Sequence, residues 1–207
     1  MQYLIFDFDG VIGDTYEAAV NAHVEMGSEP TIEAARVEME RYFTTKPHHT
    51  RSHTLTKEEM LAEYDWVSRF GAIMHKNGIP LFKTFVDEIC KIETKYKAVV
   101  SSGSQQYVLP ALAKTNINPS HTLAFENHHS KEEKIEAVCR DWGVKVEEVY
   151  YITDTLADVF ELRDMIQPGK LIAVSWGFCS YQQLATELDE RYILKNPSDI
   201  HKVLTYA

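Results

Sequence analysis

The chain of 207 residues has few cysteines, an excess of acidic over basic residues, and no long apolar run. Cys90, Cys139 and Cys179 stand far apart in no paired spacing, which argues against a disulfide framework or a zinc ribbon and indicates a reducing compartment. Lys and Arg number 21 against 31 Asp and Glu, a net charge of −10, which argues against a general nucleic-acid binder.

Membrane partners are not expected either. No apolar run approaches the ~20 residues that a membrane span requires, and residues 1–7 reach an acidic side chain too early for a signal peptide. With 44% apolar and 25% charged residues, the composition is that of a folded protein. We therefore expect a cytoplasmic protein without a nucleic-acid or membrane partner.

Short apolar runs without alternation recur along the chain, and such runs suit strands that are covered on both faces. The clearest are residues 3–6, 98–100, 149–152 and 171–174, with weaker candidates at 122–125 and 192–194. Helical segments separate the later runs, at about residues 104–115, 131–142 and 155–166. Alternating strands and helices predict an α/β fold with a parallel sheet and helices on both of its faces.

Residues 15–95 break this alternation. Segments 17–26 and 32–43 look helical, Thr56 to Glu59 has the spacing of a capping box that starts a long helix, and Asn77-Gly78 supplies its end. A further helix follows Pro80. We expect a core domain of residues 1–14 plus 96–207 and a helical insertion with a connecting helix at 15–95; one long crossover within a single domain is the alternative.

Polar side chains stand where the predicted strands end, and ligands collect at that edge of an open parallel sheet. They are Asp7 and Asp9, Ser101 and Ser102, Asp154, and Ser175. Asp7 and Asp9, two residues apart on an extended segment, point the same way. Asp158, four residues after Asp154, would lie near it in the first turn of the next helix. Carboxylates gathered at one edge predict a divalent cation, Mg²⁺ or Ca²⁺, between them.

Positive charge and an anion cradle are available at the same edge. Ser130 to Glu133 has capping-box spacing, which places Lys131 at the first helical position and nearer the site than Lys134, although either lysine could serve. The turn at 101–105, rich in hydroxyls and glycine, leads into a helix whose N-terminus favours an anion. Each signal alone fits an ordinary cap, turn or solvated lysine, but together they provide the groups that transfer a phosphoryl group.

The segment Phe6 to Thr15, which reads FDFDGVIGDT, resembles the opening DxDG motif of the haloacid dehalogenase superfamily. The other three motifs of that superfamily follow in order, at Ser101, at Lys131, and at the pair Asp154 and Asp158. The resemblance covers nearly the whole chain. It implies a Rossmann-like core, with the helical insertion as the C1 cap. One departure is Thr153, where many members have Gly, Glu or Asp.

By that resemblance, Asp7 is the nucleophile that forms an aspartyl-phosphate, and Asp9 is the general acid and then the base that activates water. The resemblance further implies that Ser101, with the amides around Ser102 and Gly103, holds the phosphate, and that Lys131 balances the charge. By the same resemblance, Mg²⁺ would be held by Asp7, the backbone carbonyl of Asp9, and Asp154, with Asp158 nearby in a supporting role.

Residues 46–54 cluster basic side chains without an acid. We expect Arg51, or Lys46 or a nearby histidine, to bind an anionic part of the substrate, because arginine pairs well with phosphate and carboxylate groups. A polar surface loop is the alternative. The histidines of this segment, His48, His49 and His53, have poor spacing for a zinc site.

Three other features are interpreted as structural or left open. The apolar stripe from Met60 to Met74 is interpreted as core of the insertion, and the segment 176–179 as a turn with partly buried aromatics. His128 and His129 fit either the mouth of the site or a solvated loop.

The predicted function is a Mg²⁺-dependent phosphatase that acts on a small soluble phosphomonoester. The alternatives are a phosphomutase of the same superfamily or a phosphate-binding protein that has lost catalysis. The substrate and the oligomeric state are left open.

Overall fold

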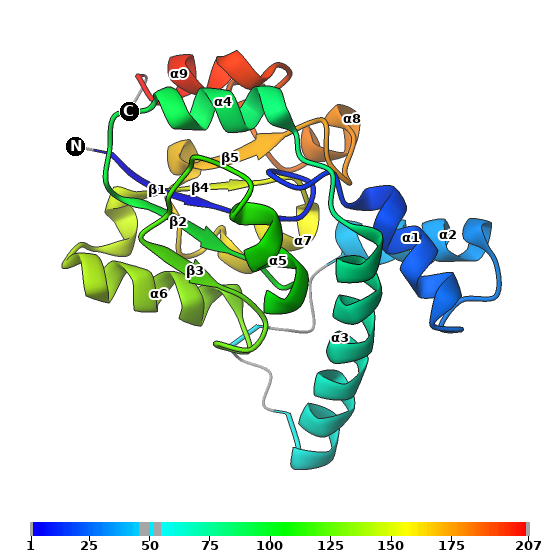
Figure 1. Cartoon of the computed structure of the whole chain (residues 1–207). Coiled ribbons are helices and arrows are strands. Elements are labelled where there is room, and N and C mark those ends of the chain that lie inside the picture. Colours follow the sequence, from blue (N-terminus) through cyan, green and yellow to red (C-terminus); the bar gives the residue numbers. More distant parts are fainter. Residues whose placement is uncertain (1, 46–49, 52–54, 206–207) are drawn as a thin grey trace.

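The computed structural model describes residues 2–45, 50–51 and 55–205. Within them a six-stranded parallel sheet has the order β3-β2-β1-β4-β5-β6 (Figure 1). The strands are β1 (Tyr3–Phe6), β2 (Lys97–Val100), β3 (His121–Leu123), β4 (Val149–Thr153), β5 (Leu171–Val174) and β6 (Ile193–Leu194). All six lie at or within a few residues of the predicted runs. The α/β class with a parallel sheet is thus confirmed.

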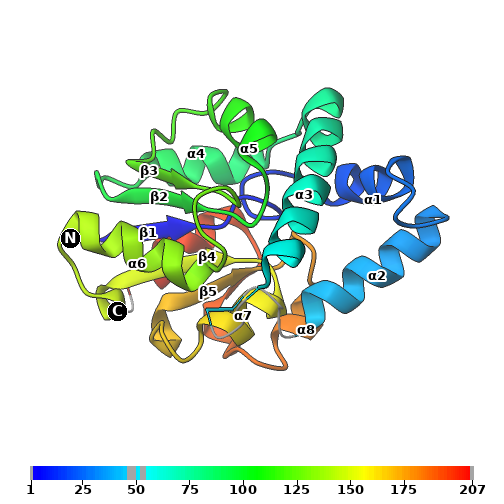
Figure 2. The ribbon, with the colours of Figure 1, turned by 90° about the horizontal axis from the view of Figure 1, so that it is seen from below.

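Alternate residues of each central strand contribute to two different cores, which is why the strands are apolar throughout. Leu4 and Phe6 of β1 pack in one core, while Ile5 packs in the other. The first core is closed by α4 (Lys83–Lys91), α5 (Gln105–Leu112) and α9 (Ile200–Val203). The second is closed by α6 (Lys131–Trp142) and α7 (Leu156–Leu162), which lie on the face of the sheet that is turned toward the viewer in Figure 2.

Three helices between the first two strands lie to one side of the sheet (Figure 1). They are α1 (Tyr16–Glu25), α2 (Ile32–Thr44) and α3 (Lys57–Asn77). The helical insertion after the first strand is therefore confirmed. The insertion contacts the sheet layer in several places, and in two of them a helix packs against a helix: α3 against α5, and α2 against α7.

Local sequence signals explain where α3 and α6 begin. Thr56 forms both hydrogen bonds of a capping box with Glu59, and Ser130 does the same with Glu133. Helix α6 accordingly begins at Lys131, as predicted. The remaining elements are short: α8 (Tyr181–Leu184) and four 3₁₀ turns at 146–148, 168–170, 190–192 and 197–199. Among the described residues, no helix combines the length and the apolarity needed to cross a bilayer.

Candidate active site

The site lies where the strand order reverses. Strands β1 and β4 are neighbours in the sheet, but the chain leaves β1 toward β2 and β3 and returns to β4 on the other side. Helices that follow the two strands therefore diverge, and their diverging ends leave a crevice at the carboxyl edge. This topology brings Asp7 and Asp9, which follow β1, close to Asp154, which follows β4.

Lys131 joins Asp7 to Asp158 in a buried ion-pair cluster. Its Nζ lies 2.6 Å from Asp7 Oδ2, and it lies 2.8 and 2.6 Å from the two oxygens of Asp158. The second oxygen of Asp7 accepts the backbone N–H of Phe8 at 2.7 Å. Burial lowers the pKa of Lys131, but the carboxylates of Asp158 and Asp7 more than offset this and raise it, so the ammonium stays charged.

Asp158 is held by further donors besides Lys131. The hydroxyl of Thr153 donates to Asp158 Oδ2 at 2.7 Å, and that of Tyr151 donates at 3.1 Å. Asp158 lies in the first turn of α7, as expected. These donors occupy the oxygens of Asp158. Its position therefore suits a residue that orients Lys131 better than one that binds a cation directly. The hydroxyl of Thr153, the departure from the family pattern, serves this arrangement.

Asp9 is oriented by two hydroxyl groups from the segment after β2. Tyr107 donates to Asp9 Oδ2 at 2.9 Å, and Ser101 donates to the same oxygen at 3.1 Å. Burial raises the pKa of Asp9, although the hydrogen bond from Tyr107 lowers it. The amide of Gly103 donates to Ser101 Oγ at 2.8 Å, so this part of the expected anion cradle supports the Ser101 side chain.

Asp154 is enclosed by two loops. Its Oδ2 accepts the backbone N–H of Phe178 at 2.6 Å. Gly10, at a φ of 71°, approaches so closely that a Cβ there would lie 1.9 Å from that oxygen, and one at Gly177 would lie 2.2 Å from it. Only residues without a side chain fit these positions, and at Gly10 the positive φ also favours glycine. The other oxygen, Oδ1, is buried without a hydrogen-bond partner.

The buried carboxylates outnumber the buried positive charge. Burial raises the pKa of Asp7 well above its ordinary value, against the lowering effect of Lys131, and three neighbouring carboxyl groups add to the rise: those of Asp158, Asp154 and Asp9. Burial likewise raises the pKa of Asp154 to about 8. Lys131, the lysine that contacts Asp7 and Asp158, does not balance this cluster, and an unpaired buried carboxylate oxygen is costly.

A divalent cation with oxygen ligands fits these observations. Among the described residues, no three acidic, His or Cys side chains already converge as a metal cluster. The expected ligand set differs from such a cluster, because it combines the carboxylates of Asp7 and Asp154 with the backbone carbonyl of Asp9. The orphaned Oδ1 of Asp154 and the unbalanced charge are both consistent with that set.

The two candidate lysines have separate positions. Lys131 contacts Asp7, whereas Nζ of the fully buried Lys134 donates to the carbonyl of Ser101 at 2.7 Å. Glu161, which sequence reasoning missed, accepts the N–H of Lys131 at 2.8 Å and so fixes the start of α6. Burial raises the pKa of Glu161 to about 7.

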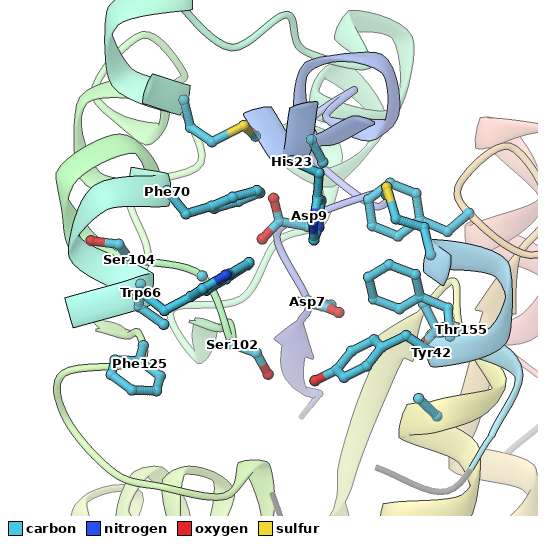
Figure 3. Close-up of a pocket in the computed structure, with 18 of the residues that line it drawn as sticks. Asp7, Asp9, His23, Tyr42, Trp66, Phe70, Ser102, Ser104, Phe125 and Thr155 are labelled. Atoms are coloured by element: carbon cyan, nitrogen blue, oxygen red, sulfur yellow. The ribbon is translucent and has the colours of Figure 1, made fainter. Parts of the chain in front are cut away.

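A cavity of about 480 Å³ adjoins Asp7 and Asp9 between the sheet edge and the helical insertion (Figure 3). Ser102 and Lys131 line it from the core. Tyr42 of α2, a second residue that sequence reasoning missed, points its hydroxyl into the cavity. Burial raises the pKa of Tyr42 to about 12, so its hydroxyl remains a hydrogen-bond donor at neutral pH.

Arg51, expected to bind substrate, is not among the residues that line the cavity. Its guanidinium donates to Glu136 at 2.7 Å and lies 3.4 Å from Glu132, both on α6. These acids come from a distant part of the sequence, so the basic segment alone gave no sign of them. Lys46 and the three histidines of that segment, His48, His49 and His53, lie outside the described residues.

Two features interpreted as structural contribute to the cavity. Val67, Phe70 and Met74 of the stripe on α3 line it, whereas Met60 and Tyr64 of the same stripe are exposed. The interpretation of the whole stripe as buried core is therefore wrong, because helical periodicity shows which side chains share a face and not what covers that face. His129, whose role the sequence leaves open, and Phe178, from the segment interpreted as a turn, also line the cavity.

Comparison with known proteins agrees with this geometry. A family model described as haloacid dehalogenase-like hydrolase matches residues 4–161. Over 219 residues the chain is 24% identical to a phosphoglycolate phosphatase of Synechococcus elongatus, covering 99% of this chain and 98% of that protein.

Solved structures agree with the fold. A predicted phosphoglycolate phosphatase from Haemophilus somnus matches with a TM-score of 0.68 at 14% identity, covering 99% of this chain and 98% of that one. A haloacid dehalogenase-like family hydrolase from Streptococcus pneumoniae matches with a TM-score of 0.69 at 20% identity, covering 100% and 98%. At these identities the likenesses show a shared fold and carry no information on substrate choice.

Proposed function

The chain belongs to the haloacid dehalogenase-like hydrolase family, and from that premise we propose that it is a Mg²⁺-dependent phosphatase acting on a small soluble phosphomonoester. The observation that carries the proposal is the pairing of Lys131 Nζ with Asp7 Oδ2 at 2.6 Å, next to a hydrogen-bonded Asp9 on the same cavity. It unites a buried carboxylate nucleophile, a fixed positive charge and a second carboxyl group.

In the first step an oxygen of Asp7 attacks phosphorus. The bond from phosphorus to the alcohol oxygen breaks, and the proton of Asp9 passes to that oxygen, so that the alcohol leaves neutral and Asp7 carries an acyl phosphate. The raised pKa of Asp9 suits an acid that has to hold its proton until this step. Two easier displacements thus replace a difficult one.

In the second step Asp9, now a carboxylate, takes a proton from water, whose oxygen attacks phosphorus. The bond to Asp7 breaks, inorganic phosphate leaves, and both carboxyl groups return to their starting states. Tyr107 and Ser101 keep Asp9 aimed at the cavity throughout. Lys131 keeps Asp7 in place and offsets part of the negative charge brought by the phosphate.

Mg²⁺, held by Asp7, the carbonyl of Asp9 and Asp154, would neutralise phosphate charge that one lysine leaves unbalanced. The cation is expected to satisfy the orphaned Oδ1 of Asp154. Asp158 would then orient Lys131, with which it makes two short contacts, and would not bind the cation directly. Phosphoglycolate, named for the relative from Synechococcus elongatus, is one ester to test.

The test is release of phosphate from a panel of phosphomonoesters, with and without Mg²⁺. Wild type and the exposed-site control Asp164→Asn are expected to turn over the same esters in a Mg²⁺-dependent manner. Asp7→Asn is expected to lose at least about 10³-fold in kcat, because it removes the nucleophile. Equal turnover in Asp7→Asn, or turnover that ignores Mg²⁺, would contradict the proposal.

A further inference from the structure

The cavity is far larger and more aromatic than transfer of a phosphoryl group requires. Resting on the proposed function, we propose that the alcohol portion of the substrate is a flat aromatic ring without a second negative charge. The two side walls of the cavity and the charge of its lining, all formed by described residues, favour such a ring.

One wall is a stack of aromatic rings on α3. Trp66 and Phe70 stack with their centroids 4.8 Å apart and their planes at 14°. His23 of α1 packs against both, at 5.5 Å from each ring. Figure 3 shows the rings of Trp66 and Phe70 lying side by side along this wall, on the opposite side of the two aspartates from Tyr42. Trp66, which lines the cavity, remains 36% exposed, although burying a tryptophan ring is strongly favourable.

The opposite wall is aromatic as well and comes from different elements. Phe43 at the end of α2 stacks on Phe178 with centroids 4.5 Å apart and planes at 25°. Tyr42 adds a phenol directed into the space between the walls. Two aromatic walls on either side of the phosphate-reacting groups form a slot, and a flat ring would pack between them.

The charge of the lining argues against a second anion. Among the described residues that line the cavity, Lys131 is the one lysine or arginine, and it is already paired with Asp7 and Asp158. From the insertion come three carboxylic acids, Glu29, Glu38 and Glu63, of which Glu38 pairs with Arg41 and Glu63 lies 4.0 Å from His129, and Arg51 lies outside the cavity. A carboxylate on the leaving group would be repelled by the acids and would not be solvated by the aromatic faces. A neutral ring meets no such cost.

Size agrees with this assignment. A volume of about 480 Å³ lies within the range of sites for small organic molecules. A two-carbon acid would fill only a small part of it, and would leave the rings of Trp66 and Phe70 uncovered. The shape of the slot therefore favours a flat ring, and the charge of its described lining disfavours a second anion.

A matched pair of esters separates the alternatives. Benzyl phosphate and 2-phosphoglycolate have the same CH₂–O–phosphate group and differ only in a phenyl ring against a carboxylate. We expect kcat/KM for benzyl phosphate to be at least about tenfold higher. Cyclohexylmethyl phosphate, apolar but not flat, is expected to fall between them.

The aromatic wall is tested with Trp66→Ala, and the control is Leu61→Ala at an exposed position of the same helix. Trp66→Ala is expected to raise KM for benzyl phosphate about 5–10-fold with kcat little changed, because stacking is lost but the reacting groups are intact. KM for 2-phosphoglycolate is expected to stay the same in both variants. Equal effects of Trp66→Ala on the two esters would overturn the assignment.

Binding separates failure of this inference from failure of the proposed function. Calorimetry with Mg²⁺ present compares 2-phenylethylphosphonate with 3-phosphonopropionate, which mimic the two esters without a cleavable bond. Tighter binding of the phenyl compound supports the aromatic slot even if neither ester is hydrolysed, a result that would contradict only the phosphatase proposal. Hydrolysis of 2-phosphoglycolate with tighter binding of 3-phosphonopropionate would overturn the aromatic slot and leave the phosphatase proposal supported.

Discussion

Lys131 Nζ lies 2.6 Å from Asp7 Oδ2, although 124 residues separate the two side chains in the sequence. The distance is set by two strand-to-helix junctions, because Asp7 follows β1 and Lys131 is the first residue of α6. Both side chains are almost completely buried, so their charges are poorly screened. This pair anchors the proposed chemistry.

Replacing Lys131 by Met leaves Asp7 and Asp158 as buried carboxylates without their cation. We expect a loss of about 3–5 kcal/mol in the free energy of unfolding, typical of removing one partner of a buried ion pair. Activity is expected to fall by at least about 10²-fold. Denaturant unfolding and phosphate release measure the two effects, and the exposed-site control Lys114→Met is expected to change neither. Retention of full activity would rule out the assigned role of Lys131.

Mg²⁺ binding has a readout besides activity. Because the cation binds the folded chain, saturating Mg²⁺ is expected to raise Tm, by mass action worth about 2.7 kcal/mol at a concentration of 100 Kd. Asp154→Asn is expected to lose most of this rise, whereas Asp164→Asn, at an exposed position, is expected to keep it. A Tm rise of equal size in wild type and Asp154→Asn would place the cation elsewhere.

The lowered pKa of Lys134 makes the stability of the folded chain depend on pH. Burial lowers its pKa from 10.5 to about 8 in the folded chain. Between these values the unfolded chain binds a proton that the folded chain does not, so stability is gained as pH rises through this window. The free energy of unfolding of wild type, relative to Lys134→Met, is expected to rise by about 3 kcal/mol from pH 8 to 10.5. A difference that stays flat across the window would contradict the lowered pKa.

The contact between α3 and α5 depends on a residue without a side chain. A Cβ at Gly71 would lie 2.7 Å from the Cβ of Ser104, which caps α5. Gly71→Val is therefore expected to push the helices apart and to cost about 1–3 kcal/mol of stability. Ala72→Val, on the exposed side of the same helix, tests the intrinsic effect of valine alone. Thermal unfolding that shows equal shifts for the two variants would contradict close packing at Gly71.

Much of the fold could be predicted because buried parallel strands are short runs of consecutive apolar residues, which are visible in the local sequence. The runs at 3–6 and 149–152 are apolar on both faces, and the structure covers both faces of each strand. The capping signals at Thr56 and Ser130 are equally local, since each needs only a partner three residues on. Residues at strand ends could be grouped because the carboxyl ends of parallel strands share an edge.

The rest of the site depends on contacts that no local pattern records. Tyr107 reaches Asp9 across 98 residues, and Glu161 reaches the amide of Lys131 across 30. The acids that pair with Arg51 come from a different helix, so a segment that looks basic in the sequence carries no free arginine for a substrate. The aromatic slot is hidden for the same reason, because its walls come from helices and a loop that meet only after folding.

The central claim is that Asp7 accepts the phosphoryl group. The most direct measurement is a single turnover of benzyl phosphate with Mg²⁺, quenched in acid and followed by mass spectrometry of the peptide that carries Asp7. We expect a transient gain of one phosphoryl group on Asp7, which forms as the alcohol appears and decays as phosphate is released. Burst release of alcohol and phosphate together, with no phosphoryl group on Asp7 at any time, would contradict it.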